Sequence, residues 1–421
     1  MRHVLAIILS FLFVISAGFS SVGAAVEQHP AAAPVTVRWG AWMTEQAPAL
    51  RKIAREFEAS HPGIRIDLQF TPFTTYWTKR RSEAKQNRLP DVFAMNVPSF
   101  AFYASRGFLM PLNRRIAADR VSLAHYPRAV ITSSTYKKTV YALPKDFDVI
   151  GLWYNKAMFD AAGLSYPNGT WTWKTLYAAA KRLTNRAKGT WGIAAQLKDQ
   201  EGYYNTVYQA GGYVISKNQK RSGFDNPKSI RGLKFWTDLI RLGYSPRANQ
   251  MTDPDAKNNL FTSGKVAMIF GGDWLAREFA TNSYLRGKVD VAPLPRDARP
   301  ATVIQSTSWV IPARTPRANA AWKFLKFLGS ARAAYIQADA GFVIPAYLGT
   351  QSVWVSTWPQ LHLKSFLAEL VYSVPYPASI DSDAWQTTAN NYLARAWAGK
   401  MSVAKAAKII ARKMNASLRA E

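Results

Sequence analysis

A regular alternation of strand-like and helix-like segments is the feature that most restricts the fold of this chain. Residues 35–39 favour a strand, residues 47–60 have the apolar spacing of an amphipathic helix, and residues 64–70, IRIDLQF, alternate apolar and polar side chains. A turn at His61-Pro62-Gly63 separates the helix from the second strand, and residues 90–95 predict a third strand entered through a proline. Because the alternation continues along the chain, it predicts an α/β protein with largely parallel sheets, whose ligands bind beyond the carboxyl ends of strands.

The first 25 residues have the composition of a secretory signal peptide. Arg2 and His3 precede an apolar run at residues 4–15, and small residues follow it. The run is short for a membrane span, so we expect cleavage after Ala24 or Ala25, with an uncleaved anchor as the alternative. The chain has no cysteine, which excludes disulfides and a lipid attached through an N-terminal cysteine. We therefore expect an exported protein without a lipid anchor, in the periplasm or at the extracellular face of the cytoplasmic membrane.

Size and charge restrict the class of protein further. The 421 residues exceed one ordinary core, so two domains are expected. The formal net charge of +28 becomes +27 when residues 1–25, which hold Arg2 and no acid, are removed. The basic residues occur in short pairs and triplets, such as Lys79-Arg80-Arg81, and form no long block. This pattern favours a general attraction to anionic envelope polymers over nucleic-acid binding, and adaptation to an acidic medium is a third explanation.

The stretch LFTSGKVAMIFGGDW, residues 260–274, changes character halfway along. Residues 265–270 are apolar and partly β-branched, as in a short buried strand. Gly271 and Gly272 then give up side-chain packing for backbone freedom, and the chain presents an acid, Asp273, and a large ring, Trp274. An acid and an indole at the end of a strand predict a ligand-binding position, although a Trp packed under a loop would give the same pattern.

Seven segments, in this order, resemble the extracellular solute-binding proteins that feed ABC importers, in the large sugar-binding group that includes maltose-binding protein. They span nearly the whole chain after the signal peptide and are FEASHPGIRIDLQF, LPDVFAM followed by RGFLMPLN, YALPKDFDVIGLWYNKAMFDAAGL, TWKTLYAAAKRLT, FTSGKVAMIFGGDW, AAWKFLKFLGS and AWAGKMSVAKAAKIIARKMN. The resemblance implies two α/β lobes, each a mainly parallel sheet flanked by helices, with the ligand in the cleft between them. It implies an N-terminal lobe of residues 34–146 plus 296–331 and a C-terminal lobe of residues 147–295 plus 332–421.

A sugar presents hydroxyl groups that need hydrogen-bond partners and flat apolar faces that lie on aromatic rings. Trp274 could cover such a face, Asp273 could accept two hydroxyl hydrogen bonds, and Gly272 would let the backbone approach the ligand. Asp146 and Asp148 are separated by one residue, so in an extended segment they point to the same side. The resemblance places a crossing between the lobes at this motif and implies that Asp148 contacts sugar.

Loops after other strands supply further candidates for the sugar site, which are Trp42, Asn96, Ser99, Tyr203, Tyr204, Ser306 and Trp309. For each of these a packed ring or a capped turn explains the residue equally well. We assign Asn155 to the cap of the helix that follows it, and Trp171, Trp236 and Trp322 to the core.

Motifs typical of enzymes are missing from the sequence. The five histidines show no metal-ligand spacing, and there is no Gly-x-Ser-x-Gly elbow, phosphate-binding loop or dinucleotide fingerprint. We therefore expect no metal, no cofactor and no catalysis. An acid and nucleophile pair of a glycosidase, formed by Asp146 and Asp148, is the alternative.

The sequence and the resemblance together predict a monomeric receptor that captures a mono- or oligosaccharide by hinge closure. It would deliver the sugar to the membrane permease of an ABC importer and would bind no nucleic acid. Within the same fold, a polyol phosphate would favour a basic cleft and a polyamine an acidic one. The alternative from another class is a secreted glycoside-active enzyme or a polysaccharide adhesin, which would need a general acid with a raised pKa or an open surface groove.

Overall fold

The computed structural model describes residues 33–421, and Pro34–Glu421 form one compact unit. The predicted signal peptide at residues 1–25 lies outside the described residues. Within the described part, no helix combines the length and the apolar composition that crossing a bilayer requires.

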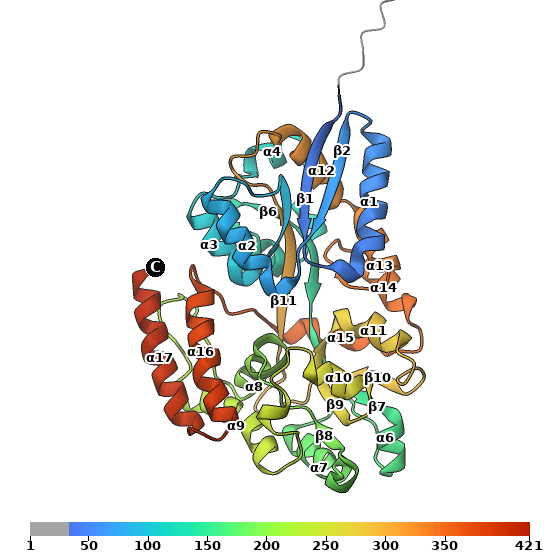
Figure 1. Ribbon diagram of the computed structural model, residues 1–421, viewed down its shortest axis with the longest axis vertical. Coiled ribbons are helices and arrows are strands. Elements are labelled where there is room, and N and C mark those ends of the chain that lie inside the picture. The colour runs from blue at the N-terminus through green and yellow to red at the C-terminus, as the bar shows by residue number, and fades with distance from the viewer. Residues whose placement is uncertain (1–32) are drawn as a thin grey trace, which may run out of the picture. The chain divides into compact units, whose positions relative to one another are not determined.

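Two sheets carry the fold (Figure 1). The large sheet has seven strands in the order β12-β6-β11-β3-β1-β2, with β13 beside β11, and the small sheet has four in the order β10-β7-β9-β8. In Figure 1, β1, β2, β6 and β11 occupy the upper part of the molecule and β7 to β10 the lower part. The strands are β1 (Val35–Ala41), β2 (Ile64–Phe70), β3 (Val92–Asn96), β4 (Thr135–Tyr136), β5 (Thr139–Val140), β6 (Ala142–Asp148), β7 (Ile150–Asn155), β8 (Trp191–Ile193), β9 (Val266–Gly272), β10 (Val289–Ala292), β11 (Thr302–Val310), β12 (Ile344–Pro345) and β13 (Ser373–Pro375).

Helices pack against both sheets and complete an α/β architecture (Figure 1). They are α1 (Ala47–Ser60), α2 (Phe73–Lys85), α3 (Val97–Ser105), α4 (Asn113–Ala118), α5 (Arg128–Ser133), α6 (Lys156–Ala161), α7 (Trp173–Leu183), α8 (Tyr204–Gln209), α9 (Pro227–Arg241), α10 (Ala256–Thr262), α11 (Ala276–Thr281), α12 (Ala318–Leu328), α13 (Ala331–Asp339), α14 (Gln351–Thr357), α15 (Lys364–Ala368), α16 (Ser382–Trp397) and α17 (Val403–Ala420).

The predicted β-α-β start of the chain is confirmed. The helix α1 and the strand β2 have the predicted bounds, and β3 begins two residues after Pro90. Apolar residues recur at helical spacing along α1, so Leu50, Ile53 and Phe57 lie on one face and are fully buried against the large sheet. Burying side chains of this size contributes roughly 1.5–3 kcal/mol each, which fixes the helix on the sheet.

Local predictions for capping and core residues are also confirmed. Asn155 accepts a hydrogen bond from the backbone N–H of Met158 at 3.2 Å and caps α6. The indoles of Trp171, Trp236 and Trp322 are buried, as predicted.

The pairing of the strands is mixed, which corrects the prediction of largely parallel sheets. β1 is parallel to β2 and β3, and β8 to β9. However, β11 is antiparallel to β3 and β6, and β7 is antiparallel to β9 and β10. The chain leaves the large sheet along β6 and returns along β11, so these neighbours run in opposite directions. Parallel pairing would require a crossover back to the same end of the sheet, which this path does not make.

The crossing between the two sheets lies at the motif where the resemblance implied it. β6 ends at Asp148 in the large sheet and β7 begins at Ile150 in the small one. The Thr302 hydroxyl, at the start of β11, donates to the carbonyl of Ile150 at 3.0 Å and accepts from its N–H at 3.2 Å. The outgoing and returning segments are therefore tied together, and the limits assigned above to each lobe stay a prediction.

Candidate functional site

A cavity of about 530 Å³ lies between the two sheets. It is bordered by the ends of β1, β3 and β6, where the rule for open α/β sheets places ligands. We call it the cleft and define it by its lining residues, which are Trp42, Met43, Glu45, Gln46, Phe73, Trp77, Asn96, Pro98, Ser99, Asp146, Asp148, Lys198, Asp199, Gln200, Glu201, Pro254, Asp255, Lys257, Asn258, Trp274, Gln305, Thr307, Val343, Tyr376, Asp383 and Gln386.

Aromatic rings form one wall of the cleft. Trp42 follows β1, and its ring centroid lies 5.7 Å from those of Phe73 and Trp77. Phe73 and Trp77 are four residues apart on α2, so they share one helix face. Phe73 is 55% exposed, which is unusual for a phenyl ring, and the wall therefore offers apolar surface to a ligand.

Trp274 reaches the cleft from the opposite sheet, at the end of β9. Its ring is half-buried and packs against buried core residues. A Cβ atom at Gly272 would lie 1.9 Å from Cζ3 of Trp274. Glycine at 272 therefore makes room for the indole, which corrects the expectation that it lets the ligand approach the backbone.

The carboxylates of Asp146 and Asp148 both face the cleft, as their alternation along β6 predicts. Asp146 forms an ion pair with Lys145 and accepts a hydrogen bond from the Thr307 N–H at 3.1 Å. Burial raises the pKa of Asp148 well above its ordinary value, and the negative charges of Asp146 and Asp273 raise it further, against the opposing effects of Lys145 and Gln305. Burial therefore favours the protonated form of Asp148, and contact with a ligand can shift this protonation equilibrium.

Asp273 lies behind the cleft wall and holds the crossing segments together. Its carboxylate accepts hydrogen bonds from the N–H groups of Val149 at 2.8 Å and Ile344 at 3.4 Å, and its side chain is fully buried. Burial raises the pKa of Asp273 to about 8, although the Val149 N–H favours the ionised form. Because both carboxylate oxygens serve the backbone, the predicted contact with sugar hydroxyls does not fit this position.

A polar network closes the far side of the cleft. The Lys257 ammonium, on α10, donates to Glu201 and to the carbonyl of Phe270, both at 2.7 Å, and burial lowers the pKa of this lysine. The Tyr376 hydroxyl donates to Asp199 at 2.7 Å, and the Gln386 amide donates to that hydroxyl at 2.7 Å. These contacts orient the carboxylates of Asp199 and Glu201 at the cavity.

Several buried polar atoms of the lining have no hydrogen-bond partner within residues 33–421. They are Oε1 of Gln46, Nε1 of Trp77, Oγ of Ser99, Nε2 of Gln200 and Oδ1 of Asn258. Buried polar groups are almost always paired in folded proteins, so a cluster of unpaired donors and acceptors around one cavity indicates a site for a polar ligand.

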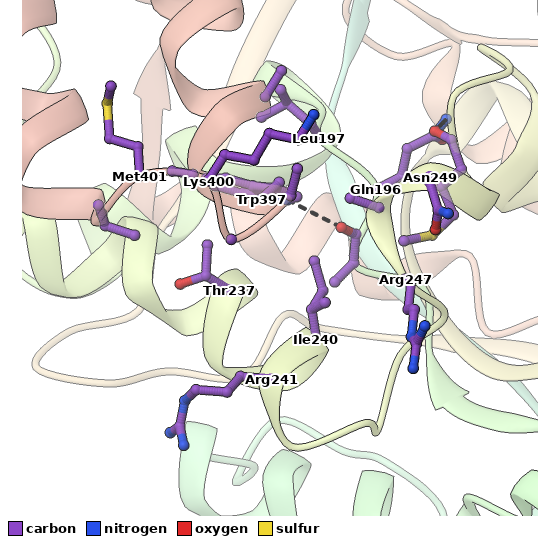
Figure 2. Close-up of a pocket in the computed structure, with 18 of the residues that line it drawn as sticks. Gln196, Leu197, Thr237, Ile240, Arg241, Arg247, Asn249, Trp397, Lys400 and Met401 are labelled. Carbon is purple, nitrogen blue, oxygen red and sulfur yellow. Dashed lines mark hydrogen bonds between the residues drawn. The ribbon is translucent and has the colours of Figure 1, made fainter.

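A second, larger cavity of about 1340 Å³ shares Lys198 and Pro254 with the lining of the cleft. It lies between the C-terminal end of α9, residues 247–254 and the turn from α16 to α17. Figure 2 shows Trp397, Ile240 and Met401 around it, with Arg241, Arg247 and Lys400 also among its lining. The dashed line marks the Trp397 indole N–H, which donates to the carbonyl of Ala195 at 3.1 Å. None of the residues predicted to bind ligand lines this cavity.

Comparison with known proteins assigns the chain to a family. The profile of the family described as bacterial extracellular solute-binding protein matches residues 40–335, more than half of the chain.

The chain belongs to this family.

Individual relatives of this solute-binding protein are distant in sequence and close in fold. It is 23% identical over 311 residues to the galactooligosaccharide-binding protein of Bacillus subtilis, covering 72% of this chain and 70% of the relative. It is 24% identical over 324 residues to the mannitol-binding protein of Pseudomonas aeruginosa, covering 75% of this chain and 72% of the relative. An ABC substrate-binding protein of Listeria monocytogenes, solved in complex with cycloalternan, matches with a TM-score of 0.86, 24% identity and coverage of 91% and 99%. The two-lobed fold is thereby shown.

Half of the twelve predicted site residues line the cleft of this solute-binding protein. They are Trp42, Asn96, Ser99, Asp146, Asp148 and Trp274. Asn96 also caps α3, because its side chain accepts from the N–H of Ser99 at 3.2 Å. The other six, which are Tyr203, Tyr204, Gly272, Asp273, Ser306 and Trp309, do not line it.

Local geometry keeps four of these residues out of the cleft. Tyr203 and Tyr204 are fully buried and pack edge to face with centroids 4.8 Å apart. Ser306 lies between Gln305 and Thr307, which line the cleft, so the alternation of the strand points it to the other side. Trp309 lies on the same side of β11 as Gln305 and Thr307 but further along the strand, where it pairs with Ala94 of β3 and packs in the core against Trp39.

Several lining residues had escaped the sequence analysis. The polar run Asp199-Gln200-Glu201 follows β8 and is separated from the two predicted tyrosines only by Gly202. The pairs Phe73 with Trp77 and Asp383 with Gln386 have the spacing of one helix face, which the sequence does contain. The sequence does not say that these faces meet across a cleft.

Proposed function

We propose that this protein captures a sugar in the cleft and delivers it to the membrane permease of an ABC importer. One observation carries the proposal: the cleft combines flat aromatic rings with carboxylates and unpaired polar atoms, contributed by both sheets. Rings such as Trp42 and Trp274 suit the apolar faces of a sugar, and the polar groups suit its hydroxyls.

Relatives support a polyhydroxylated ligand. The names of the related proteins specify galactooligosaccharide and mannitol, and the Listeria protein was solved with cycloalternan. A cavity of about 530 Å³ suits a ligand of one to a few sugar rings.

The cleft lies between two sheets joined by crossing segments, which suits closure around a ligand. A ligand that touches both lobes stabilises the closed form only, and this difference lets a permease distinguish loaded from empty receptor. We propose that the mature protein acts as a monomer, outside the cytoplasmic membrane, without a lipid anchor and without nucleic acid.

We propose that the bound sugar is not chemically changed. A glycosidase would need both carboxyl groups of β6 at the bound sugar. The carboxylate of Asp146 is instead paired with Lys145 and accepts a hydrogen bond from the Thr307 N–H. Chromatography of a bound oligosaccharide after long incubation should return it intact; hydrolysis or transfer would assign the protein to the glycoside-active class.

A thermal-shift screen with mono-, di- and trisaccharides tests the proposed ligand class. At a hundred times its Kd, a ligand that binds only the folded protein stabilises it by about 2.7 kcal/mol, which raises the melting temperature measurably. No response to any sugar, together with a response to a polyol phosphate or a polyamine, would overturn the proposal in favour of that ligand.

A further inference from the structure

The cleft is acidic, although the chain is strongly basic. The lining contains seven carboxylates, contributed by Glu45, Asp146, Asp148, Asp199, Glu201, Asp255 and Asp383, and two ammonium groups, contributed by Lys198 and Lys257. The whole chain has 26 acidic and 54 basic residues. More than a quarter of all its acids therefore surround one cavity, which holds only two of its basic side chains.

Ion pairs within the protein account for fewer than half of these carboxylates. Asp146 pairs with Lys145, Glu201 with Lys257 and Asp383 with Arg81. Among residues 33–421, Glu45, Asp148, Asp199 and Asp255 have no ion-pair partner within 4.0 Å, and Lys198 is the one lining cation left over. The protein thus leaves an excess of negative charge facing the cavity.

Of these unpaired acids, Asp148 and Asp199 are the least exposed, and neutral groups hold Asp199 in place. The Tyr376 hydroxyl and the Gln200 N–H donate to Asp199, at 2.7 and 2.6 Å. Asp148 is 9% exposed and has Gln305 opposite it in β11. Neutral donors fix the position of the Asp199 carboxylate without cancelling its charge. Burial raises the pKa of Asp148 and favours its protonated form, and an ammonium group beside it would favour the carboxylate.

The aromatic wall fits the same ligand. A cation over the face of an indole is attracted by the ring quadrupole, and this attraction is strongest when both groups are removed from water. Trp42, Trp77 and Trp274 all line the cleft beside these acids. A phosphate-bearing ligand is disfavoured, because it would meet several carboxylates and one unpaired ammonium group.

We propose that the cleft selects a sugar that carries a positively charged amine, and that Asp148 and Asp199 bind the ammonium group. This inference rests on the proposed function, since the aromatic wall and the unpaired polar atoms of Ser99 and Asn258 serve the rings and hydroxyls of the same ligand. The high overall charge does not oppose it, because the local field of a cleft is set by the groups that line it.

Matched sugar series test the charge preference by titration calorimetry on the full mature chain at neutral pH and low salt. Each series contains the amino sugar, its N-acetyl form, which keeps the ring and removes the charge, and the parent sugar with a hydroxyl. Glucosamine, galactosamine and mannosamine serve as single rings, and β-1,4-linked glucosamine oligomers as longer ligands. The amino form of at least one series should bind about tenfold or more tightly than both neutral forms, as expected for a charge-assisted contact.

Variants locate the preference. Asp148→Asn should lower the affinity for the amino form about tenfold more than it lowers the affinity for the N-acetyl form. Asp199→Asn, at a half-exposed position that tolerates substitution more readily, provides the same comparison if Asp148→Asn does not fold. The control is Asp225→Asn, which removes a charge from an exposed residue outside the cleft and should change neither affinity.

Failure of this inference and failure of the proposed function give different results. If neutral sugars bind as tightly as their amino forms, the charge preference is overturned and sugar capture stands. If the amino preference survives in both variants, the assignment to Asp148 and Asp199 is overturned. If no sugar binds while spermidine does, both the proposed function and this inference are overturned.

Discussion

At the residue scale, the end of β9 shows how one short segment divides its tasks. Asp273 ties the crossing segments through backbone N–H groups, Gly272 leaves space, and Trp274 reaches the cleft. Three consecutive residues therefore have different roles: Gly272 makes room for a ring, Asp273 binds backbone N–H groups, and Trp274 lines the cleft.

Removing the indole of Trp274 should affect both binding and stability. Trp274→Ala removes an aromatic surface of the cleft, so we expect a loss of about 2–4 kcal/mol in binding a sugar, as for other buried aromatic anchors. The ring also packs against the core, so the ligand-free protein should melt at a lower temperature, which the sequence alone did not predict. Calorimetry and thermal melting measure the two effects. Trp358→Ala, a half-buried indole outside the cleft, should lower the melting temperature and leave binding unchanged.

The contact between Gly272 and Trp274 predicts strong coupling of two substitutions. Gly272→Ala places a Cβ where the indole packs, so the ring must move, and both stability and sugar affinity should fall. In the Trp274→Ala background the same change should cost less, with a coupling energy of about 1–2 kcal/mol in a double-mutant cycle of unfolding free energies. Strict additivity of the two effects would contradict this account of the glycine.

Asp148 should make the stability of the ligand-free protein depend on pH. Its pKa is raised in the folded protein, so the folded state holds its proton more strongly than the unfolded state above the ordinary aspartate pKa of 3.8. The unfolding free energy contributed by this group therefore falls as pH rises through that range, by at most about 1.4 kcal/mol per pH unit. Denaturant unfolding from pH 5 to pH 8 should show a flatter profile for Asp148→Asn. An unchanged profile would mean that Asp148 has an ordinary pKa.

At the element scale, the cleft is spanned by a contact between α2 and α16. Arg81 on α2 forms an ion pair with Asp383 on α16, and its guanidinium also lies 4.5 Å from the ring centroid of Phe102 on α3. α16 belongs to the core of the small-sheet lobe through Trp385 and Leu393. The pair therefore joins the two sides of the cleft at its edge.

Breaking this pair should weaken ligand binding slightly, because it favours the form in which the two sides lie close. About a third of each side chain is exposed, so the pair contributes under about 1 kcal/mol. Arg81→Met and Asp383→Asn should each raise the sugar Kd two- to fivefold. The Kd of the double variant should not exceed the larger of the two single-variant values. Arg241→Met removes an exposed pair with Asp238 within α9 and should leave the Kd unchanged. Additive effects of the first two changes would show that Arg81 and Asp383 act independently.

At the scale of the whole molecule, the charge distribution separates two functions. The chain has a net charge of +28, while the lining of the cleft has an excess of carboxylates. A positive surface attracts anionic envelope polymers over a distance of about 8 Å at physiological salt. Ligand selection and retention near the cell can therefore depend on different parts of the same molecule.

Salt should control this retention. The mature protein should bind vesicles of anionic phospholipid at low ionic strength and dissociate in high salt, and vesicles of neutral phospholipid should not retain it. Sedimentation with vesicles measures the bound fraction. In cell fractions, retention that resists salt and yields to detergent would indicate an N-terminal anchor.

The sequence predicted elements well where the signal is local. α1 and β2 have the predicted bounds, because apolar spacing and the His61-Pro62-Gly63 turn are properties of neighbouring residues. The alternation of Asp146 and Asp148 along an extended strand likewise predicted that both face one side. The family resemblance added the two-lobed architecture and the place of the crossing.

Tertiary structure alone decided which strand-end residues reach the cleft. Asp148 and Asp273 are both acids beside a strand end, but only the Asp273 carboxylate accepts hydrogen bonds from the backbone N–H groups of Val149 and Ile344. The antiparallel return of β11, and the packing of Trp309 against Trp39 in the core, depend on residues distant in sequence. Local sequence patterns determine which segments form helices and strands. Whether a side chain at the end of a strand is buried, hydrogen-bonded or open to the cleft depends on the residues distant in sequence that pack against it.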